Sequence, residues 1–246
     1  MSPRASASDR SASGGSGQHR PAWPGNATTA VTTAPVIAVV DYGIGNLHSA
    51  QKALAHIGAD ARLTADAGEI ERADAVVLPG VGAFGACMAA LRGARLEGAV
   101  GDAAASGRPF LGICVGMQML FSGSEEDPDA RGLGVIPGMV RWIPATVKRP
   151  QMQWNVLRTS SNDEPMFAGL VAAPWFYFVH SLHGVPDDQA VVAGTCEYGI
   201  TLNAAFRAGN VFAVQFHPEK SASAGLALLG NFVSEATRSL SGKVPG

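Results

Sequence analysis

The chain has 246 residues, 47% of them hydrophobic and 15% charged, which is enough for one large domain or two small ones with a sizeable core. Its 18 basic and 20 acidic residues give a net charge of −2, so the charge balance does not favour a nucleic acid or an acidic membrane as partner. Cys87, Cys114 and Cys196 have neither paired nor metal-type spacing, and we therefore expect reduced thiols and a cytoplasmic protein.

Residues 1–34 differ in composition from the rest of the chain. They are rich in Ser, Ala, Gly and Thr, contain Arg4, Arg10 and Arg20, and lack the apolar core of a secretory signal. Such a segment buries too little apolar surface to offset its ordering entropy, so we predict a disordered tail. A transit peptide is the alternative, but Asp9 and the pair Pro21 and Pro24 fit it poorly. No stretch approaches the roughly 18 apolar residues of a membrane-spanning helix.

The first half of the remaining chain alternates apolar runs with helical periodicity. Buried strands are predicted at Val36–Val40, Ala59–Leu63, Ala75–Leu78 and Phe110–Ile113. Helices are predicted at Leu47–Ile57, Phe84–Leu91, Leu96–Ala105 and Val115–Phe121. Asn46 is the expected side-chain cap of the first helix, and Gly58 is expected to end it. Strands that alternate with helices imply βαβ units and a mainly parallel sheet.

The second half is dominated by predicted strands joined by short turns. These strands are Met139–Ile143, Trp154–Leu157, Trp175–Val179, Val191–Cys196, Thr201–Phe206 and Val211–Phe216, and a final helix is expected at Ala222–Thr237. We therefore predict one α/β domain over residues 35–240. It has an open, mainly parallel, flavodoxin-like sheet with helices on both faces, and extra antiparallel strands in its C-terminal half.

Cys114 stands in the pentad Gly112-Ile113-Cys114-Val115-Gly116, between a predicted strand and a predicted helix. A nucleophile with glycine two residues away on each side is the nucleophile-elbow pattern, because side chains at those positions would collide in the sharp turn. The N–H groups at the start of the helix favour a thiolate, and the Val115 N–H is placed to bind an oxyanion. The alternative is a buried structural cysteine beside ordinary turn glycines.

His217-Pro218-Glu219 follows the predicted strand Val211–Phe216, at the end of the sheet where sites of parallel sheets collect. Residues two apart in an extended chain point to the same side, so Glu219 can bond one imidazole nitrogen while the other faces Cys114. A carboxylate that orients a histidine base is the logic of a catalytic triad. Taken alone, this tripeptide is more typical of a surface turn, and its weight comes from the elbow cysteine.

The segment Pro79-Gly80-Val81-Gly82 follows the strand Ala75–Leu78. Its glycines allow backbone N–H groups to turn toward an anionic centre, so Val81 and Gly82 are candidates for a second oxyanion donor. A plain strand-to-helix turn is the alternative for this segment considered alone.

Together these elements resemble class I glutamine amidotransferases, and longer strings resemble the glutaminase subunit of imidazole glycerol phosphate synthase in histidine biosynthesis. The strings are Asp41-Tyr42-Gly43-Ile44-Gly45-Asn46-Leu47, Pro79-Gly80-Val81-Gly82-Ala83-Phe84, Gly112-Ile113-Cys114-Val115-Gly116-Met117-Gln118, Tyr177-Phe178-Val179-His180-Ser181 and Gln215-Phe216-His217-Pro218-Glu219-Lys220-Ser221. The resemblance covers about Val36 to Val233.

The resemblance implies that Cys114 attacks the side-chain amide of L-glutamine and that His217 moves the protons. It implies that Gln118, Glu126 and Ser181 hold the amino-acid end of the substrate. The family's partner is a (β/α)₈ cyclase, which Asn46 and Lys220 would face. Ammonia passes to this partner, which makes imidazole glycerol phosphate and an aminoimidazole carboxamide nucleotide. No cofactor and no metal are implied.

Two departures from the family pattern bear on these expectations. The family usually has Pro-His-Met-Gly-Trp-Asn, where this chain has Pro150-Gln151-Met152-Gln153-Trp154-Asn155. That segment lies near the subunit interface in the family, so control by the partner can differ here. An aromatic residue normally follows His180-Ser181, and here Leu182-His183 follows.

Other readings of the motifs are weaker. Gly43-x-Gly45 suggests a dinucleotide site, but the third glycine position of that fingerprint is His48. His180, His183 and His217 suggest a metal, but the first two are expected to face opposite sides of one strand, with no further ligands in pattern. A glutaminase of another synthase, a stand-alone cysteine hydrolase and a non-catalytic binding module stay open, and copurification with a cyclase would separate them.

Overall fold

A computed structural model describes residues 34–161 and 163–241 of the chain. The predicted tail over residues 1–34 lies almost wholly outside the described residues. The predicted domain limits at residues 35 and 240 stay a prediction.

The part of the main sheet that carries the site consists of parallel strands in the order β2–β1–β3–β4–β14. Their bounds are β1 Val36–Val40, β2 Asp60–Thr64, β3 Ala75–Gly80, β4 Phe110–Cys114 and β14 Val211–Val214. All residues of β3, β4 and β14 are buried, as expected for strands covered on both faces, and this explains why they read as continuous apolar runs.

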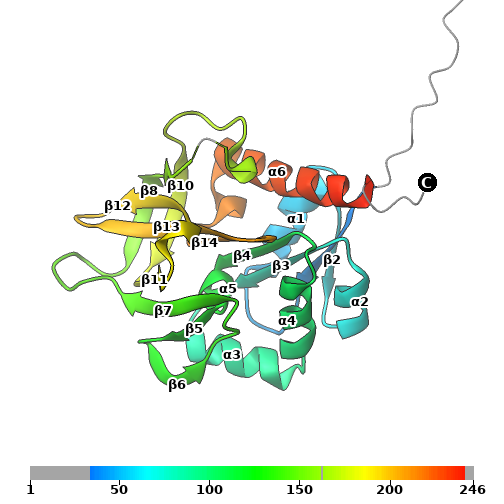
Figure 1. The fold of residues 1–246 in the computed structure, drawn as a ribbon, viewed down its shortest axis with the longest axis horizontal. Helices are drawn as coiled ribbons and strands as arrows, with labels where there is room; N and C mark the ends of the chain where they lie inside the picture. The colour runs from blue at the N-terminus through cyan, green and yellow to red at the C-terminus, as the bar shows by residue number, and fades with distance from the viewer. Residues whose placement is uncertain (1–33, 162, 242–246) are drawn as a thin grey trace, which may run out of the picture. The chain divides into compact units, whose positions relative to one another are not determined.

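Helices cover both faces of these strands (Figure 1). Helices α1 (Leu47–His56) and α6 (Ala222–Ser241) contact each other on one face, while α2 (Ala67–Arg72) contacts α4 (Glu97–Ala105) on the other, with α3 (Phe84–Gly93) on the same side. In α1 the buried residues Ala50 and Leu54 are four apart, which is the spacing of one helix face.

The remaining strands pair mostly antiparallel, with β5 and β7 as a parallel pair. Within the described residues the main sheet has eight strands and continues from β14 through β13, β12 and β9, and two smaller sheets have the orders β10–β8 and β11–β7–β5–β6. The bounds are β5 Phe121–Ser124, β6 Asp127–Arg131, β7 Ile136–Trp142, β8 Gln151–Val156, β9 Arg158–Thr159, β10 Trp175–His180, β11 Leu182–Pro186, β12 Val192–Glu197 and β13 Thr201–Ala208. Short 3₁₀ helices lie at Pro165–Phe167, Gln189–Val191 and Pro218–Lys220.

The predicted fold class is confirmed, but some local predictions are wrong and several elements were not predicted. The helix predicted at Val115–Phe121 ends after one turn as α5 (Val115–Gln118), because Phe121 already begins strand β5 and the N–H of Leu133 bonds the Met119 carbonyl. Asn46 occupies the cap position of α1 but makes no side-chain capping bond. Helix α2 was not predicted, nor were strands β5, β6, β9 and β11.

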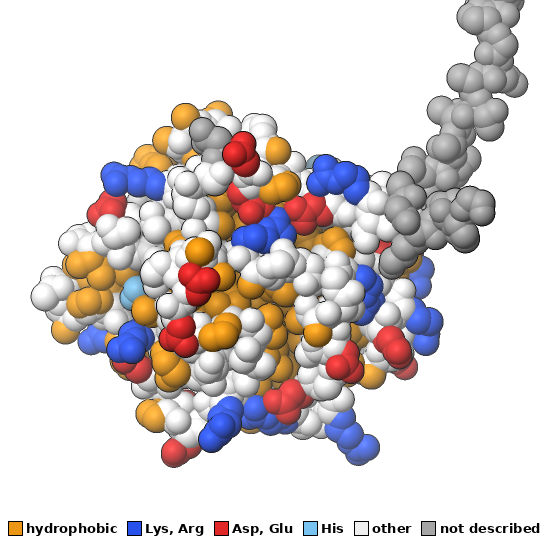
Figure 2. All heavy atoms as spheres, in the orientation of Figure 1, with side chains coloured by type: hydrophobic (Ala, Val, Ile, Leu, Met, Phe, Trp, Pro, Cys, Tyr) orange, Lys and Arg blue, Asp and Glu red, His pale blue; other side chains and the backbone are white. Residues whose placement is uncertain are grey.

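Acidic and basic side chains are interspersed over the face of the molecule shown in Figure 2, without a large region of one sign. This agrees with the balanced composition. No helix among the described residues is long and apolar enough to cross a membrane.

Candidate active site

A pocket of about 290 Å³ lies at the carboxyl ends of β3, β4 and β14. Its lining residues are Val81, Gly82, Cys114, Val115, Gln118, Glu126, Pro150, Val179, His180, Ser181, Leu182, His217 and Lys220. All the site residues predicted from the sequence line this pocket except Glu219 and Asn46, which lie behind His217. The carboxyl end of a parallel sheet is where α/β folds place their sites.

Cys114 sits in a strained turn between β4 and α5. Its backbone has φ +54° and ψ −115°, a conformation that L-residues rarely adopt. The flanking glycines are required by space, since a Cβ on Gly116 would lie 1.9 Å from the carbonyl oxygen of Leu78 and one on Gly112 would lie 2.8 Å from Cδ1 of Leu120. The geometry is therefore that of the nucleophile elbow predicted from the pentad.

His217 and Glu219 form a buried pair. Nδ1 of His217 lies 2.8 Å from Oε1 of Glu219, and their side chains are 3% and 2% exposed. Asn46 donates its side-chain N–H to the same carboxylate oxygen at 3.2 Å, so its amide supports the pair instead of capping α1. Since Nδ1 is engaged by Glu219, Nε2 is the nitrogen left for Cys114.

The environment of His217 favours its protonated form. Burial by itself would lower the pKa of His217, but hydrogen bonds to Cys114 and Glu219, together with their charges, outweigh it and raise the pKa to about 9. A protonated imidazole beside a thiol supports the thiolate.

The backbone of His217 is fixed on both sides. Its N–H donates to the Tyr177 carbonyl at 3.0 Å, and its own carbonyl accepts from Oγ of Ser221 at 2.6 Å. The preceding Phe216 stacks on Phe176 with ring centroids 4.1 Å apart. These contacts tie His217 to strand β10 and position its ring. The part that Ser221 plays in this was not predicted from the motif.

Three side chains bond the backbone of residues 79–84, which run from the end of β3 to the start of α3. Tyr42 donates its hydroxyl to the Pro79 carbonyl at 2.7 Å, and Cys87 donates its thiol to the Val81 carbonyl at 3.2 Å. Oε2 of Glu126 accepts from the Phe84 N–H at 2.7 Å. In a planar trans peptide the N–H points opposite to the C=O, so the Gly82 N–H points away from Cys87.

Two buried glutamines extend from the sulfur. Gln215 directs its side-chain N–H toward Sγ of Cys114 at 3.7 Å and accepts from the amide of Gln118 at 3.1 Å. Gln215 was not predicted as a site residue. The signal for it is its position two residues before His217, on the same side of an extended chain.

The opposite wall of the pocket comes from antiparallel strands. It contains Pro150 and the corner Val179–Leu182, where β10 ends and β11 begins. His180 and His183 therefore lie on different strands, which corrects the prediction that they share one. His180 is buried, with Nδ1 2.7 Å from the Leu182 carbonyl oxygen and Nε2 2.9 Å from Oε1 of the Gln151 side-chain amide.

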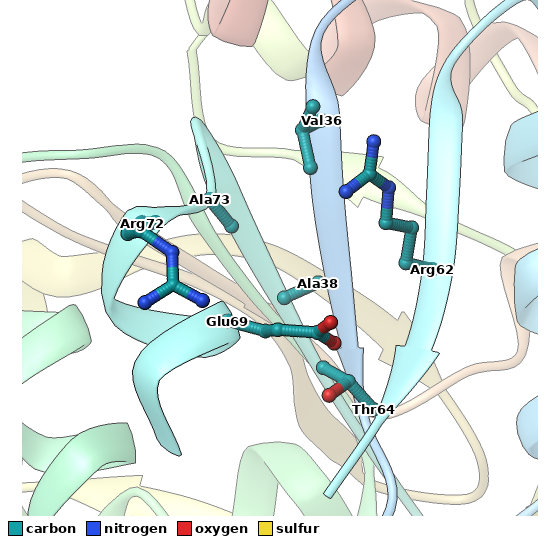
Figure 3. A pocket seen from close by; sticks show the side chains of 7 residues that line it. All are labelled: Val36, Ala38, Arg62, Thr64, Glu69, Arg72 and Ala73. Atoms are coloured by element: carbon teal, nitrogen blue, oxygen red, sulfur yellow. The ribbon is translucent and has the colours of Figure 1, made fainter. Parts of the chain in front are cut away.

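A second cavity, of about 160 Å³, lies near the other edge of the sheet (Figure 3). Arg62, Arg72 and Glu69 point around an apolar floor formed by β1 and the end of α2. It holds none of the predicted site residues and mixes both charges. Across residues 34–161 and 163–241, no group of three or more His, Cys, Asp or Glu side chains is placed to hold a metal ion.

Comparisons with known proteins identify the class. Residues 38–236 match the family model described as glutamine amidotransferase class-I. Two solved structures show the same fold: one titled as a glutamine amidotransferase, with TM-score 0.65 and 22% identity over 81% of this chain and 98% of that one, and PurLQS from Thermotoga maritima, with TM-score 0.62 and 21% identity over 83% and 98%. The chain belongs to the class I glutamine amidotransferase family.

Within that family its curated relatives include HisH subunits of imidazole glycerol phosphate synthase. The subunit of Moorella thermoacetica is 48% identical over 80% of this chain and 93% of its own length. The subunit of Methanothermobacter thermautotrophicus is 50% identical over 80% and 98%. The prediction of a glutamine amidotransferase subunit of this synthase is thereby confirmed.

Proposed function

We propose that this chain hydrolyses L-glutamine to L-glutamate and ammonia, with Cys114 as nucleophile, His217 as general base and acid, and Glu219 as the group that orients His217. One observation carries the proposal: His217, which is bonded to Glu219 at 2.8 Å, lines the same pocket as the elbow cysteine Cys114. Family membership supports the reaction class, and the side-chain geometry supports the assignment of roles.

In the first half-reaction the proton of the Cys114 thiol passes to Nε2 of His217, and the sulfur attacks the side-chain carbonyl carbon of glutamine. The carbonyl oxygen becomes an oxyanion. The N–H groups of Val115, Val81 and Gly82 are the candidate donors to it, since all three residues line the pocket. His217 then gives its proton to the nitrogen, ammonia leaves and a thioester to Cys114 remains.

In the second half-reaction His217 takes a proton from water, and the resulting hydroxide adds to the thioester carbon. The C–S bond breaks, glutamate is released and the proton returns to the sulfur. Glu219 keeps the imidazole in one orientation throughout and supports its positive charge. We assign the amino-acid end of the substrate to Gln118, Glu126 and Ser181, because a carboxylate suits the α-ammonium group and all three residues face the pocket.

We further propose a cytoplasmic complex with a (β/α)₈ cyclase that consumes the ammonia and releases imidazole glycerol phosphate and an aminoimidazole carboxamide nucleotide. The outer face of the β8–β10 ribbon suits such a partner, since Met152, Trp154 and Trp175 are 64%, 44% and 55% exposed. Lys220 is exposed at the pocket and is assigned to the same interface. We also assign Asn46 to this interface, where its role would be indirect, through its hydrogen bond to Glu219.

The decisive test is Cys114→Ala in the assembled complex. Glutamine-dependent synthesis should disappear while synthesis from added ammonium salt continues, because Cys114 serves only to release ammonia. Size-exclusion chromatography shows that the complex is intact. Loss of both activities in an intact complex would contradict this division of labour.

A glutaminase assay with and without the cyclase and its nucleotide substrate tests the partnership. We expect little turnover by the isolated chain and a large increase on addition of both. Full turnover without the partner would instead identify a stand-alone hydrolase.

A further inference from the structure

The pocket wall formed by Val179–Leu182 is held by a buried chain of polar side chains that the proposed reaction does not use. Gln151 on β8 lies directly opposite His180 on β10 in the antiparallel ribbon. Cys196 on β12 lies on the far side of Gln151, with Sγ 3.9 Å from its amide nitrogen and 4.0 Å from its amide oxygen. Gln151 and Cys196 are fully buried and His180 is 6% exposed, so each polar atom needs a partner within the protein.

The donor in each of these hydrogen bonds can be assigned from the two ends of the network, Leu182 and Cys196. Leu182 offers a carbonyl oxygen, which can only accept, so Nδ1 of His180 carries a proton. Burial lowers the pKa of His180 to about 4, and the neighbouring His183 and His217 act in the same direction. The ring is therefore neutral, and Nε2 presents a lone pair to the side-chain amide of Gln151, whose oxygen Oε1 is placed 2.9 Å away. An oxygen cannot donate to that lone pair, so we infer that the amide is turned by 180°, which exchanges its oxygen and nitrogen and brings the NH₂ toward Nε2.

The other end of the chain agrees with this orientation. Burial raises the pKa of Cys196 to about 12, so its sulfur keeps a proton that it can donate. With the amide nitrogen of Gln151 toward His180, the amide oxygen faces that thiol. Hydrogen bonds are then donated in one direction, from Cys196 to Gln151, from Gln151 to His180, and from His180 to the Leu182 carbonyl.

We propose that Gln151 is a positioning residue for the glutamine pocket: its amide NH₂ holds His180 as the neutral tautomer protonated on Nδ1, and this fixes the corner that carries Ser181 and Leu182. The inference rests on the proposed function, since it assigns the shape of the substrate pocket to a residue that touches no substrate. The corner has a further anchor, because the Ser181 carbonyl accepts from the Ile143 N–H at 2.9 Å. Ser181 is thus held between two fixed neighbours.

The first experiment reads the tautomer directly. In the full chain labelled with ¹⁵N-histidine, the ring of His180 should show a protonated Nδ1 and an unprotonated Nε2, with no change between pH 8 and pH 5. In Gln151→Glu both ring nitrogens of His180 should be protonated, because a carboxylate on one side of the ring and a carbonyl on the other stabilise the doubly protonated form. A wild-type ring protonated on Nε2, or on both nitrogens at pH 7, overturns the proposal.

The second experiment measures the pocket by calorimetric binding of L-glutamine to the full chain, with Cys114→Ala present throughout so that no hydrolysis occurs. Gln151→Leu should raise the dissociation constant about tenfold, since His180 loses its donor and the corner loosens. The matched control is Gln153→Leu, which makes the same substitution at an exposed position of the same strand and should leave the constant unchanged.

An unchanged dissociation constant in correctly folded Gln151→Leu overturns the proposal. Should that variant unfold, the tautomer in the wild type and in Gln151→Glu still decides. Absence of glutamine binding in every variant, including the reference with Gln151 intact, would instead contradict the proposed function and leave the tautomer result to judge the inference separately.

Discussion

The two walls of the pocket are built by different means. On the parallel-sheet wall, backbone geometry places Cys114, with a positive φ at the cysteine and glycines that have no room for a side chain. On the ribbon wall, the corner Val179–Leu182 depends on bonds among the side chains of Gln151, His180 and Cys196. We therefore expect local changes around Cys114 to be tolerated poorly, whereas the substrate-facing wall can vary with the residues behind it.

Gly116→Ala should have the largest effect on stability and activity, because it places a side chain where the parallel-sheet wall of the pocket has the least space. The new Cβ would lie 1.9 Å from the Leu78 oxygen, so β3 or the elbow must move. We expect a loss of about 3 kcal/mol or more in the free energy of unfolding, measured by urea denaturation, and no glutaminase activity in the complex. Gly101→Ala in α4 is the control, with open space around the new Cβ and an expected gain of about 0.5–1 kcal/mol.

Glu219→Gln tests the one part of the catalytic wall that depends on a side-chain pair. It keeps the shape of the residue but removes the charge that orients His217, and we expect kcat of the complex to fall about 10³- to 10⁴-fold. Glu235→Gln is the matched control, since Glu235 is another largely buried carboxylate that pairs with Arg207 away from the pocket. Stability can fall in this control, but an equal loss of kcat would mean that Glu219 has no special role.

The pH dependence of the free energy of unfolding tests the same pair, His217 and Glu219. The pKa of His217 is raised from 6.5 to about 9 in the folded chain, so its contribution is fully present below pH 6.5 and is lost as the pH rises through 9. We expect the free energy of unfolding to fall by on the order of 2–3 kcal/mol over that window, followed by chemical denaturation at fixed pH values. In Cys114→Ala the fall should shrink, because the contact with Cys114 is a main cause of the raised pKa.

Cys87→Ala should have the smallest effect and sharpens the contrast between the walls. It removes the thiol that holds the Val81 carbonyl, but β3 stays paired with β4 through Gly80 and Cys114. We expect kcat to fall about threefold to tenfold with little change in KM, and Cys87→Ser to restore much of it. A drop as large as that of Glu219→Gln would show that side chains control the oxyanion segment as strongly as the backbone does.

The same contrast explains what could be predicted from the sequence. The parallel strands, the elbow and the His217–Glu219 pair follow from local patterns, because buried runs, glycine spacing and a two-residue repeat each have one structural solution. Helix α2 could have been found as well, since the side chain of Asp66 caps it by accepting from the Glu69 N–H at 2.9 Å, a spacing visible in the sequence.

The rest depends on contacts between distant residues. The chain after Gln118 has the apolar character of a helix, and only its pairing with Leu133 and with strand β7 turns it into β5. Asn46 has the right residue type for a cap, but the carboxylate of Glu219, far away in the sequence, takes its amide instead. The bond between Gln151 and His180 spans two strands and has no local pattern at all.

The placement of the tryptophans has a practical consequence. Among the described residues, Trp142, Trp154 and Trp175 lie in strands β7, β8 and β10 and are exposed, and the parallel strands β1 to β4 and β14 contain no tryptophan. Trp154 also packs edge-on against Tyr177, next to the ribbon residues that carry the corner. Once Trp23, the fourth tryptophan of the sequence, is replaced by Phe, the remaining intrinsic fluorescence serves as an optical reporter of these strands. The emission maximum should shift to shorter wavelength when a second protein covers the β8–β10 ribbon. Changes at the elbow around Cys114 should leave the emission nearly unchanged.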